Sequence, residues 1–457
     1  MTAAATHARA LGDWRARTGA PLPERLADAL EAALLDGRVP FSALPSERAM
    51  AAAAGVSRAT VSEAYALLRA RGWLATRRGA RAVPVLPPAL DDGLAPRDGT
   101  AAGGELIDLT LAAPAGPAGA YRAALESAER RMGAQIATTG LAGAGLPELR
   151  AALAERHTRA GLPTAPEQVL VTAGAMAALH LVCAALVPAR APAIAELPSF
   201  PAALDLLRGG GRRRVLGWPL DAAWDLELFE ALVRRRGARL AYVIPDFHNP
   251  TGRLAPLEER LAFAEAARRL DVIVVEDQTL RELDLRAGGT PEPPLASLAD
   301  GVLTLGSLSK VVWTGLRVGW VRGPRATIER LERHPLMAAA LAAAPLEQLV
   351  ALELLADLDA IAARRRTALR SRLEHLLQAL DGLDGLEARR PAGGLSVWTQ
   401  LRTPSTRLVA RAAAAGVRLS PGGRFSPDAP LDRHLRIPFA LPEATLDEAL
   451  RRLAPLL

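Results

Sequence analysis

Hydrophobic residues return at the spacing of a helix face in the first part of the chain. Residues 21–37 carry them three or four positions apart, and Gly37 ends the segment. Two short helices are predicted next, because Ser46 and Ser57 can cap their first turns and Gly55 can form the turn between them. A strand over residues 72–76, a turn over 77–80 and a return strand over 81–83 complete the pattern. This order predicts a winged helix-turn-helix domain over residues 11–84.

The pattern changes after residue 105. Short apolar or β-branched runs alternate there with helical patterns, and the runs occupy residues 169–172, 193–197, 240–245, 272–277 and 302–307. Such alternation predicts a largely parallel α/β sheet in a domain over residues 106–457, with ligands beyond the carboxyl ends of its strands. Residues 85–105 are rich in Pro, Gly, Ala and Asp without a sustained period, which predicts a linker.

The composition favours a soluble protein with a large core. The chain has 457 residues, half of them hydrophobic, and this length suits two or three domains. The single cysteine, Cys183, excludes an internal disulfide and a cysteine-rich zinc site, and we expect it to be an inert core thiol with no metal bound. Residues 168–189 are uncharged and long enough to span a membrane, but Thr172, Gly174 and His180 favour a strand, a turn and a buried helix. Residues 1–17 lack the apolar segment of a secretory signal, so we expect a cytoplasmic protein.

Positive charge is concentrated near the N-terminus. Residues 1–90 hold 12 Arg against 7 Asp and Glu, a net charge of +5 out of +7 for the whole chain. This excess favours a polyanionic partner; the alternative is a solvated arginine-rich face. Arg58 and Thr60 fall in the first turn of the second short helix, the end that enters the major groove of DNA. Ser57 favours a phosphate or is only a cap, and four arginines can neutralise the DNA backbone: Arg48, Arg77, Arg78 and Arg81.

The N-terminal sequence resembles the GntR-type transcriptional regulators over residues 21–84. The resemblance rests on Leu44-Pro45-Ser46-Glu47-Arg48, on Gly55-Val56-Ser57-Arg58-Ala59-Thr60-Val61 and on Tyr65. It implies a domain that binds promoter DNA. The wing departs from the family, because Ala80-Arg81 stand where such regulators usually place a second glycine.

Lysine is almost absent from the chain. Of the 56 Lys and Arg residues, only Lys310 is a lysine. Arginine can form ordinary ion pairs as well as lysine does, so a single lysine in an arginine-rich chain indicates that this position needs a primary amine. Such an amine can lose its proton and attack a carbonyl to form a Schiff base. A stray lysine without a role is the alternative.

Further chemically useful residues follow the predicted strands. Asp277 can hold a ring nitrogen protonated, Asn249 can donate to a phenolic oxygen, and Phe200 can stack on a flat ring. A phosphate can bind to four groups: Ser307, Arg317 and the backbone N–H groups of Ala175 and Met176. With Lys310 these groups meet the needs of pyridoxal phosphate. Phe200 as a core residue and Asn249 as part of a turn are the alternatives.

Their order and spacing resemble the fold-type-I aminotransferases over residues 106–457. The resemblance implies a PLP-dependent transferase fold with a large parallel-sheet domain and a smaller C-terminal domain. It also implies that Lys310 forms the internal aldimine, Asp277 pairs with the pyridine nitrogen, Asn249 contacts the 3-oxygen and Phe200 stacks on the ring. Arg436 lies where the family keeps an arginine for a substrate carboxylate, with a surface arginine as the alternative.

Two segments depart from that family. Gly140 stands where the family usually has a tyrosine that reaches the phosphate of the neighbouring subunit. Gln278-Thr279-Leu280 replaces a stretch that commonly supplies acidic and tyrosine side chains supporting the ring. These departures favour cofactor binding over efficient turnover.

A winged helix joined to an aminotransferase-like body resembles the MocR-type subfamily of GntR regulators. The resemblance implies a homodimer, often head-to-tail, that senses pyridoxal phosphate or an amino compound by transaldimination at Lys310. A working aminotransferase with an accessory DNA-binding domain is the second hypothesis, and a cofactor-free DNA-binding scaffold is the third.

Overall fold

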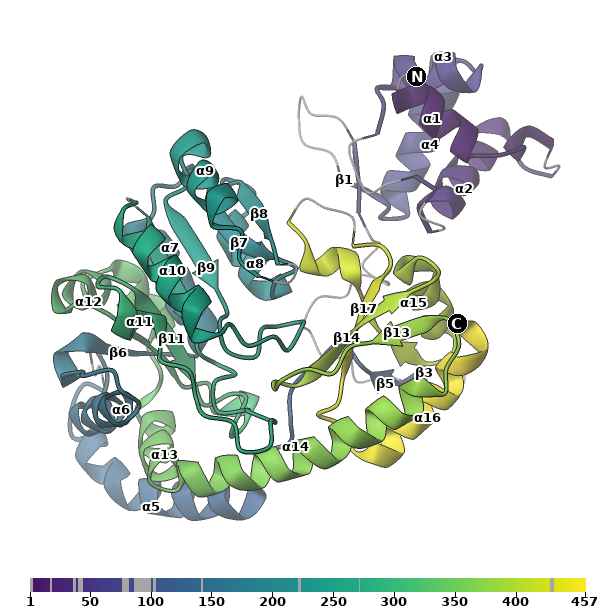
Figure 1. The fold of residues 1–457 in the computed structure, drawn as a ribbon. Helices are drawn as coiled ribbons and strands as arrows, with labels where there is room; N and C mark the ends of the chain where they lie inside the picture. Colours follow the sequence, from purple (N-terminus) through teal and green to yellow (C-terminus); the bar gives the residue numbers. More distant parts are fainter. Residues whose placement is uncertain are drawn as a thin grey trace.

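The structure is a computed structural model, and it describes residues 3–16, 19–35, 38–39, 44–75, 82–85, 100–101, 104–140, 143–220, 223–270, 272–427 and 431–457. Figure 1 shows an N-terminal group of helices, a large part built on a central sheet, and a smaller C-terminal part reached through the long helix α14 (Leu358–Asp381). Among the helices of these ranges, none combines the length and the apolar character that crossing a membrane requires.

The N-terminal part contains the predicted helix-turn-helix. Its elements are α1 (Ala3–Ala10), α2 (Leu22–Leu35), α3 (Glu47–Ala54), α4 (Arg58–Ala70) and the antiparallel pair β1 (Leu74–Ala75) and β2 (Val83–Pro84). Ser46 Oγ accepts the N–H of Ala49 at 3.3 Å and Ser57 Oγ accepts the N–H of Thr60 at 3.1 Å, so both predicted caps form. Gly55 joins the two helices at φ +62°, where glycine has no steric cost. The hydrophobic pattern did not predict α1, which packs on α3.

Seven strands form the central sheet, in the order β6-β12-β11-β10-β9-β7-β8. They are β6 (Val169–Thr172), β7 (Ala193–Leu197), β8 (Val215–Pro219), β9 (Leu240–Val243), β10 (Ile273–Asp277), β11 (Leu303–Ser307) and β12 (Gly319–Arg322). Strand β12 runs antiparallel to β6 and β11, and the remaining neighbours are parallel. The five predicted strands are confirmed, whereas β8 and β12 were not predicted because glycine interrupts their short apolar runs.

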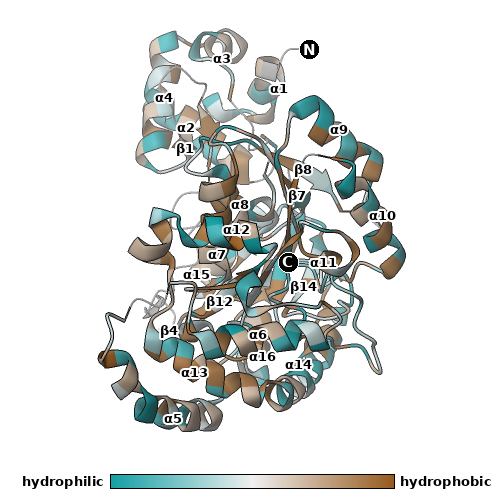
Figure 2. Cartoon of the chain, turned by 90° about the vertical axis from the view of Figure 1, so that its left-hand side faces the viewer, coloured by the Kyte–Doolittle hydropathy of each residue, from teal (hydrophilic) through white to brown (hydrophobic). Residues whose placement is uncertain are grey.

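Helices cover both faces of this sheet. The first face packs against α7 (Ala175–Leu186), α8 (Pro201–Arg208) and α12 (Arg325–Glu332). The second packs against α5 (Ala118–Ile136), α6 (Pro147–Arg159), α9 (Leu226–Arg236), α10 (Leu257–Arg268), α11 (Leu295–Leu298) and α13 (Pro345–Ala356). Figure 2 shows hydrophilic and hydrophobic residues side by side on α9 and α10, as amphipathic cover helices require.

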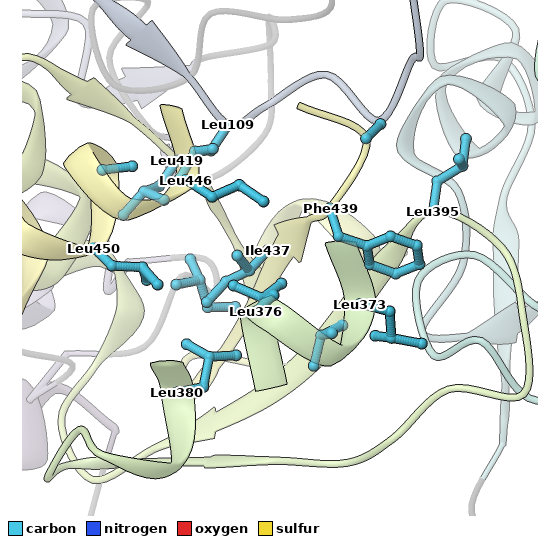
Figure 3. Packing of buried hydrophobic residues seen from close by; sticks show 14 of the residues in the cluster. Leu109, Leu373, Leu376, Leu380, Leu395, Leu419, Ile437, Phe439, Leu446 and Leu450 are labelled. Carbon is cyan, nitrogen blue, oxygen red and sulfur yellow. The ribbon is translucent and has the colours of Figure 1, made fainter. Parts of the chain in front are cut away.

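The C-terminal part is a second, smaller α/β unit. Its sheet has the order β13-β14-β17-β16 and is formed by β13 (Leu386–Ala388), β14 (Ser396–Leu401), β16 (Ser420–Pro421) and β17 (His434–Pro438). Helices α15 (Ser405–Ala414) and α16 (Glu443–Leu453) and the C-terminal half of α14 pack against it. Figure 3 shows Leu376 of α14 close to Ile437 of β17 in this core. Two short strand pairs complete the described structure. Strand β3 (Thr100–Ala101) pairs with β4 (Gly104–Glu105) ahead of the large part, and β5 (Ile107–Asp108) pairs with β15 (Val417–Arg418) of the C-terminal part.

Candidate functional site

Four of the residues singled out in the sequence line one pocket at the carboxyl edge of the large sheet: Lys310, Asp277, Asn249 and Phe200. They follow β11, β10, β9 and β7, which are adjacent in that order, so the parallel strands deliver their ends to one place. Segments far apart in sequence therefore form one concave site. The cleft between the large and small parts also contributes to it, through Leu395 and Ser396.

Lys310 carries the reactive amine of the pocket. Its Nζ donates to the backbone oxygen of Ala112 at 3.1 Å. Burial, and secondly the nearby charge of Arg436, lower the pKa of Lys310 to about 8. A lysine with this pKa is partly neutral near physiological pH, and the neutral form is the nucleophile.

Asp277 is buried at the end of β10 and is held at both oxygens. Tyr242 OH donates to Oδ2 at 2.5 Å, and the backbone N–H of Thr279 donates to Oδ1 at 2.9 Å. Burial, together with the Asp277 charge, raises the pKa of Tyr242 well above its ordinary value, so the hydroxyl remains a donor. These two hydrogen bonds orient the Asp277 carboxylate toward the pocket. A carboxylate in this position can pair with a protonated ring nitrogen.

A phosphate-sized subsite is formed where α7 begins. Gly174 has φ +98° and leads into Ala175 and Met176, whose N–H groups belong to the first helical turn and have no acceptor within the helix. A Cβ on Gly319 would lie 2.6 Å from the nitrogen of Ala175, so only glycine permits β12 to approach this turn. Arg317 lies just before β12, at φ +55°.

Arg317 and Ser307 complete this subsite from the opposite side. Arg317 Nη2 donates to the backbone oxygen of Ala173 at 2.9 Å, which places its guanidinium beside the first turn of α7. Ser307 Oγ donates to the oxygen of Val318 at 3.0 Å and lies 2.8 Å from Ser309 Oγ. A positive φ is uncommon for arginine, and residues in such conformations cluster at ligand sites. The four groups suit a dianion with three acceptor oxygens.

Arg436 lies buried on β17 and points toward the pocket. Its Nη1 donates to Asn249 Oδ1 at 3.3 Å, its Nη2 donates to the oxygen of Thr110, and its guanidinium lies 5.0 Å from the centre of the Phe425 ring. Burial lowers the pKa of Arg436 to about 10, and its Nε has no hydrogen-bond partner. Only 3% of this arginine is exposed, so the surface alternative is wrong. A buried guanidinium with an unused donor can receive a carboxylate.

The two departures from the aminotransferase pattern have structural consequences. Gly140 adopts φ +71° with open space around it, a conformation that a tyrosine would adopt only with strain. Leu280 lines the pocket where a polar ring support is expected, and Thr279 contributes its backbone N–H to Asp277 instead.

The residues predicted to contact DNA form a separate group at the start of α3 and α4. Arg48, Ser57 and Arg58 are exposed, and Thr60 is half-buried. Arg58 Nε lies 3.3 Å from Glu47 Oε2, which fixes the arginine at the start of α4. Tyr65 OH donates to the oxygen of Pro45 at 3.1 Å and fastens α4 to the start of α3. Arg77, Arg78 and Arg81 lie outside the described residues.

Three buried polar residues at the pocket were not predicted: Tyr242 and His248, which line it, and Glu196, which lies 3.4 Å from His248. Tyr242 and Glu196 lie in or at the end of apolar strands, and His248 precedes Asn249. Glu196 accepts from the N–H of Ile244 at 2.7 Å and from Trp224 Nε1 at 2.8 Å, and burial raises its pKa to about 7. The sequence signal that could have identified Tyr242 and Glu196 is a polar residue within an otherwise apolar strand. Cys183 is buried as expected, and burial raises its pKa to about 11.

Two family models match the chain. Residues 106–453 match aminotransferase class I and II, and residues 22–83 match the bacterial regulatory proteins of the gntR family. A 2-aminoadipate transaminase of Thermus thermophilus is 33% identical over 299 residues, which cover 63% of this chain and 75% of the relative. An uncharacterised HTH-type transcriptional regulator of Escherichia coli, YdcR, is 28% identical over 426 residues, which cover 85% of this chain and 88% of the relative.

Solved aminotransferases share the fold of the large and small parts. The α-aminoadipate aminotransferase LysN of Thermus thermophilus, crystallised with N-(5'-phosphopyridoxyl)-L-leucine, superposes with a TM-score of 0.67 at 30% identity and covers 77% of this chain and 91% of its own. The Pyrococcus horikoshii kynurenine aminotransferase superposes with a TM-score of 0.70 at 25% identity and covers 77% and 90%.

Proposed function

Because the chain belongs to the class I and II aminotransferase family and joins that fold to a gntR-family reader, the MocR-type arrangement, we propose that it is a pyridoxal-phosphate-dependent transcriptional regulator. The reader binds promoter DNA, and the aminotransferase-like body senses the coenzyme or an amino compound. The observation that carries the proposal is the position of the one lysine of the chain, which shares a pocket with Asp277 and Asn249.

The residues present fit the coenzyme. Lys310 would bind its aldehyde, Asp277 would face the pyridine nitrogen, Asn249 the 3-oxygen and Phe200 the ring. The phosphate would bind Ser307, Arg317 and the N–H groups of Ala175 and Met176. When bound, pyridoxal phosphate supplies an aldehyde that amines compete for and a ring that withdraws electrons.

The effector is an amine that also carries a carboxylate. Such a compound would compete with Lys310 for the coenzyme and place its carboxylate on Arg436, whose Nε is unused. Arg436 belongs to the small part and Lys310 to the large part, so a ligand that contacts both favours a closed arrangement. The ligand can shift the equilibrium between the open and closed states only to the extent that its affinities for the two states differ.

A direct contact between the small part and the reader supplies a route for the signal. Thr406 Oγ1, in the first turn of α15, donates to the backbone oxygen of Leu35 at the end of α2 at 2.8 Å. Its neighbour Ser405 Oγ accepts the N–H of Gly422, which follows strand β16, and β16 pairs with the Arg436 position of β17. If ligand binding moves β17, it would therefore also move Thr406, which contacts the end of α2.

We expect the assembly to be a cytoplasmic homodimer, with head-to-tail packing of the aminotransferase-like bodies. Two readers related by symmetry would bind repeated or palindromic half-sites whose spacing the bodies and linkers set. DNA contacts would come from Arg48, Ser57, Arg58 and Thr60, with Arg77, Arg78 and Arg81 neutralising the backbone.

A spectroscopic titration tests the proposal. The purified protein with pyridoxal phosphate should gain a visible absorption band. Borohydride should remove that band and leave the coenzyme covalently attached to Lys310. Lys310→Ala should lack the band while its thermal unfolding stays within a few degrees of wild type. Amines are then titrated while binding to the DNA flanking the gene is measured. Absence of the band in the wild-type protein, or a DNA-binding curve unchanged by every amine, contradicts the regulator with a coenzyme sensor.

A working aminotransferase is the second candidate, because relatives such as the Thermus thermophilus transaminase share the body and because Lys310, Asp277 and Arg436 are all present. Repeated turnover of an amino acid with an added keto acid would favour the enzyme. Conversion of the bound coenzyme without further turnover would favour the regulator.

A further inference from the structure

Tyr242 lines the pocket and has a buried hydroxyl, a group that neither core packing nor strand pairing requires. Strands β9 and β10 are parallel, and Tyr242 is the register partner of Val275. The side chains of both residues join the same core cluster, and Asp277, two residues after Val275, points to the same face. Two residues along a strand span about 6.6 Å, which is close to the length of a tyrosine side chain. The Tyr242 side chain can therefore span the distance from its own position to the Asp277 carboxylate.

The contact restricts Asp277 to one orientation. Tyr242 OH lies 2.5 Å from Oδ2, while the N–H of Thr279 lies 2.9 Å from Oδ1, so each oxygen has one donor from the protein. Among the described residues Asp277 forms no ion pair, and the two donors to its carboxyl oxygens are both neutral groups. A donor to a charged acceptor is roughly twice as strong as one to a neutral acceptor.

From this geometry we infer that Tyr242 is a positioning residue for the coenzyme, acting through Asp277 to aim its carboxyl group at the ring nitrogen. The inference rests on the proposed function, because it assigns a role within the coenzyme site. Leu280 cannot serve this role, since its side chain in the pocket is apolar. The side chain that supports Asp277 therefore comes from the adjacent strand, whereas the segment that follows Asp277 contributes only the backbone N–H of Thr279.

A double-mutant cycle tests this assignment. The variants are Tyr242→Phe, Asp277→Asn and the combination, and the matched control is Tyr65→Phe, which removes a buried tyrosine hydroxyl from the reader. The dissociation constant of pyridoxal phosphate is measured by visible absorption, together with the position of the absorption band, which responds to the protonation of the coenzyme. Thermal unfolding without coenzyme establishes that each variant folds.

Tyr242→Phe should weaken coenzyme binding by about ten-fold and shift the band in the direction of Asp277→Asn. In the Asp277→Asn background the same substitution should have no further effect, because the carboxylate it orients is gone. Tyr65→Phe should leave both measurements unchanged.

Three outcomes distinguish a failure of the proposed function from a failure of this inference alone. Wild-type protein that does not bind the coenzyme overturns the proposed function and this inference with it. A wild type that binds, with Tyr242→Phe indistinguishable from it, overturns the inference alone. Equal weakening by Tyr242→Phe with and without the Asp277 carboxylate shows a packing role and also overturns it.

Discussion

Lys310 is an amine whose reactivity its neighbours adjust. Burial, and secondly the charge of Arg436, lower its pKa to about 8, whereas an ordinary lysine has a pKa of 10.5. The charged form is the disfavoured one, so the neutral amine accumulates as the pH rises through 8. The remaining 55 basic side chains are arginines, which do not release a proton in this range.

The rate at which Lys310 binds the aldehyde of pyridoxal phosphate should follow this titration. We expect it to rise about ten-fold per pH unit below pH 8 and to level above it, because only the neutral amine attacks. Stopped-flow visible absorption measures the rate. Arg436→Gln should move the midpoint to higher pH by removing a nearby cation, whereas the exposed Arg212→Gln should not. A midpoint near 10 in the wild type contradicts the effect of burial.

At the scale of single elements, the start of α4 combines a helix cap with the residues that we propose contact DNA. Ser57 caps the helix and leaves Arg58 exposed at its first turn, held by Glu47. The N-terminus of a helix carries partial positive charge, which reinforces the attraction of this turn for phosphate. The same helix carries Arg69 at its far end, where the guanidinium donates to the oxygen of Tyr65.

Arg58→Ala should weaken binding to the promoter by about 1–3 kcal/mol, the usual cost of one base or phosphate contact. Arg69→Ala, on the same helix but away from its N-terminus, is the matched control and should change affinity little. Electrophoretic mobility shifts at two salt concentrations measure the effect, and the visible band of the coenzyme should be unaffected by either change. Unchanged affinity for Arg58→Ala would mean that another helix reads the DNA.

Helix α14 is the element on which the small part depends. Leu376 has no exposed surface and packs in the C-terminal core, near Ile437 (Figure 3). Leu376→Ala should lower the free energy of unfolding by about 2–5 kcal/mol, because it leaves a cavity in a packed core. The exposed Gln378→Ala on the same helix should change it by less than about 0.5 kcal/mol. Urea unfolding followed by circular dichroism makes the comparison, and equal effects of the two substitutions would contradict this packing.

At the scale of the whole molecule, the contact between Thr406 and Leu35 joins the small part to the reader. Thr406→Val keeps the shape of the side chain and removes the donor, so we expect the ligand-induced change in DNA affinity to fall by half or more. Thr367→Val, which removes a hydroxyl bonded within α14, should preserve that change. DNA binding by fluorescence anisotropy, with and without an amine that alters the coenzyme spectrum, measures both. A full ligand response in Thr406→Val would place the route elsewhere.

The sequence by itself determined the helix-turn-helix, five strands of the large sheet and the main chemical groups of the pocket. Serine caps, glycine turns and the two hydrophobic periods are local signals, so the helix-turn-helix and five strands of the large sheet were predicted and are confirmed. Lys310, Asp277, Asn249 and Phe200 were predictable as a set because parallel strands deliver their ends to one edge, where the structure brings them together.

Tertiary structure alone decided which residues support that set. Strand β12 runs antiparallel, so its start lies at the same edge as the ends of its neighbours, and this places Arg317 beside α7. Tyr242 reaches Asp277 only through the register of two strands, and Thr406 reaches Leu35 across 371 residues of chain. Such contacts depend on strand order, register and domain packing, which are non-local properties that hydrophobic periodicity does not carry.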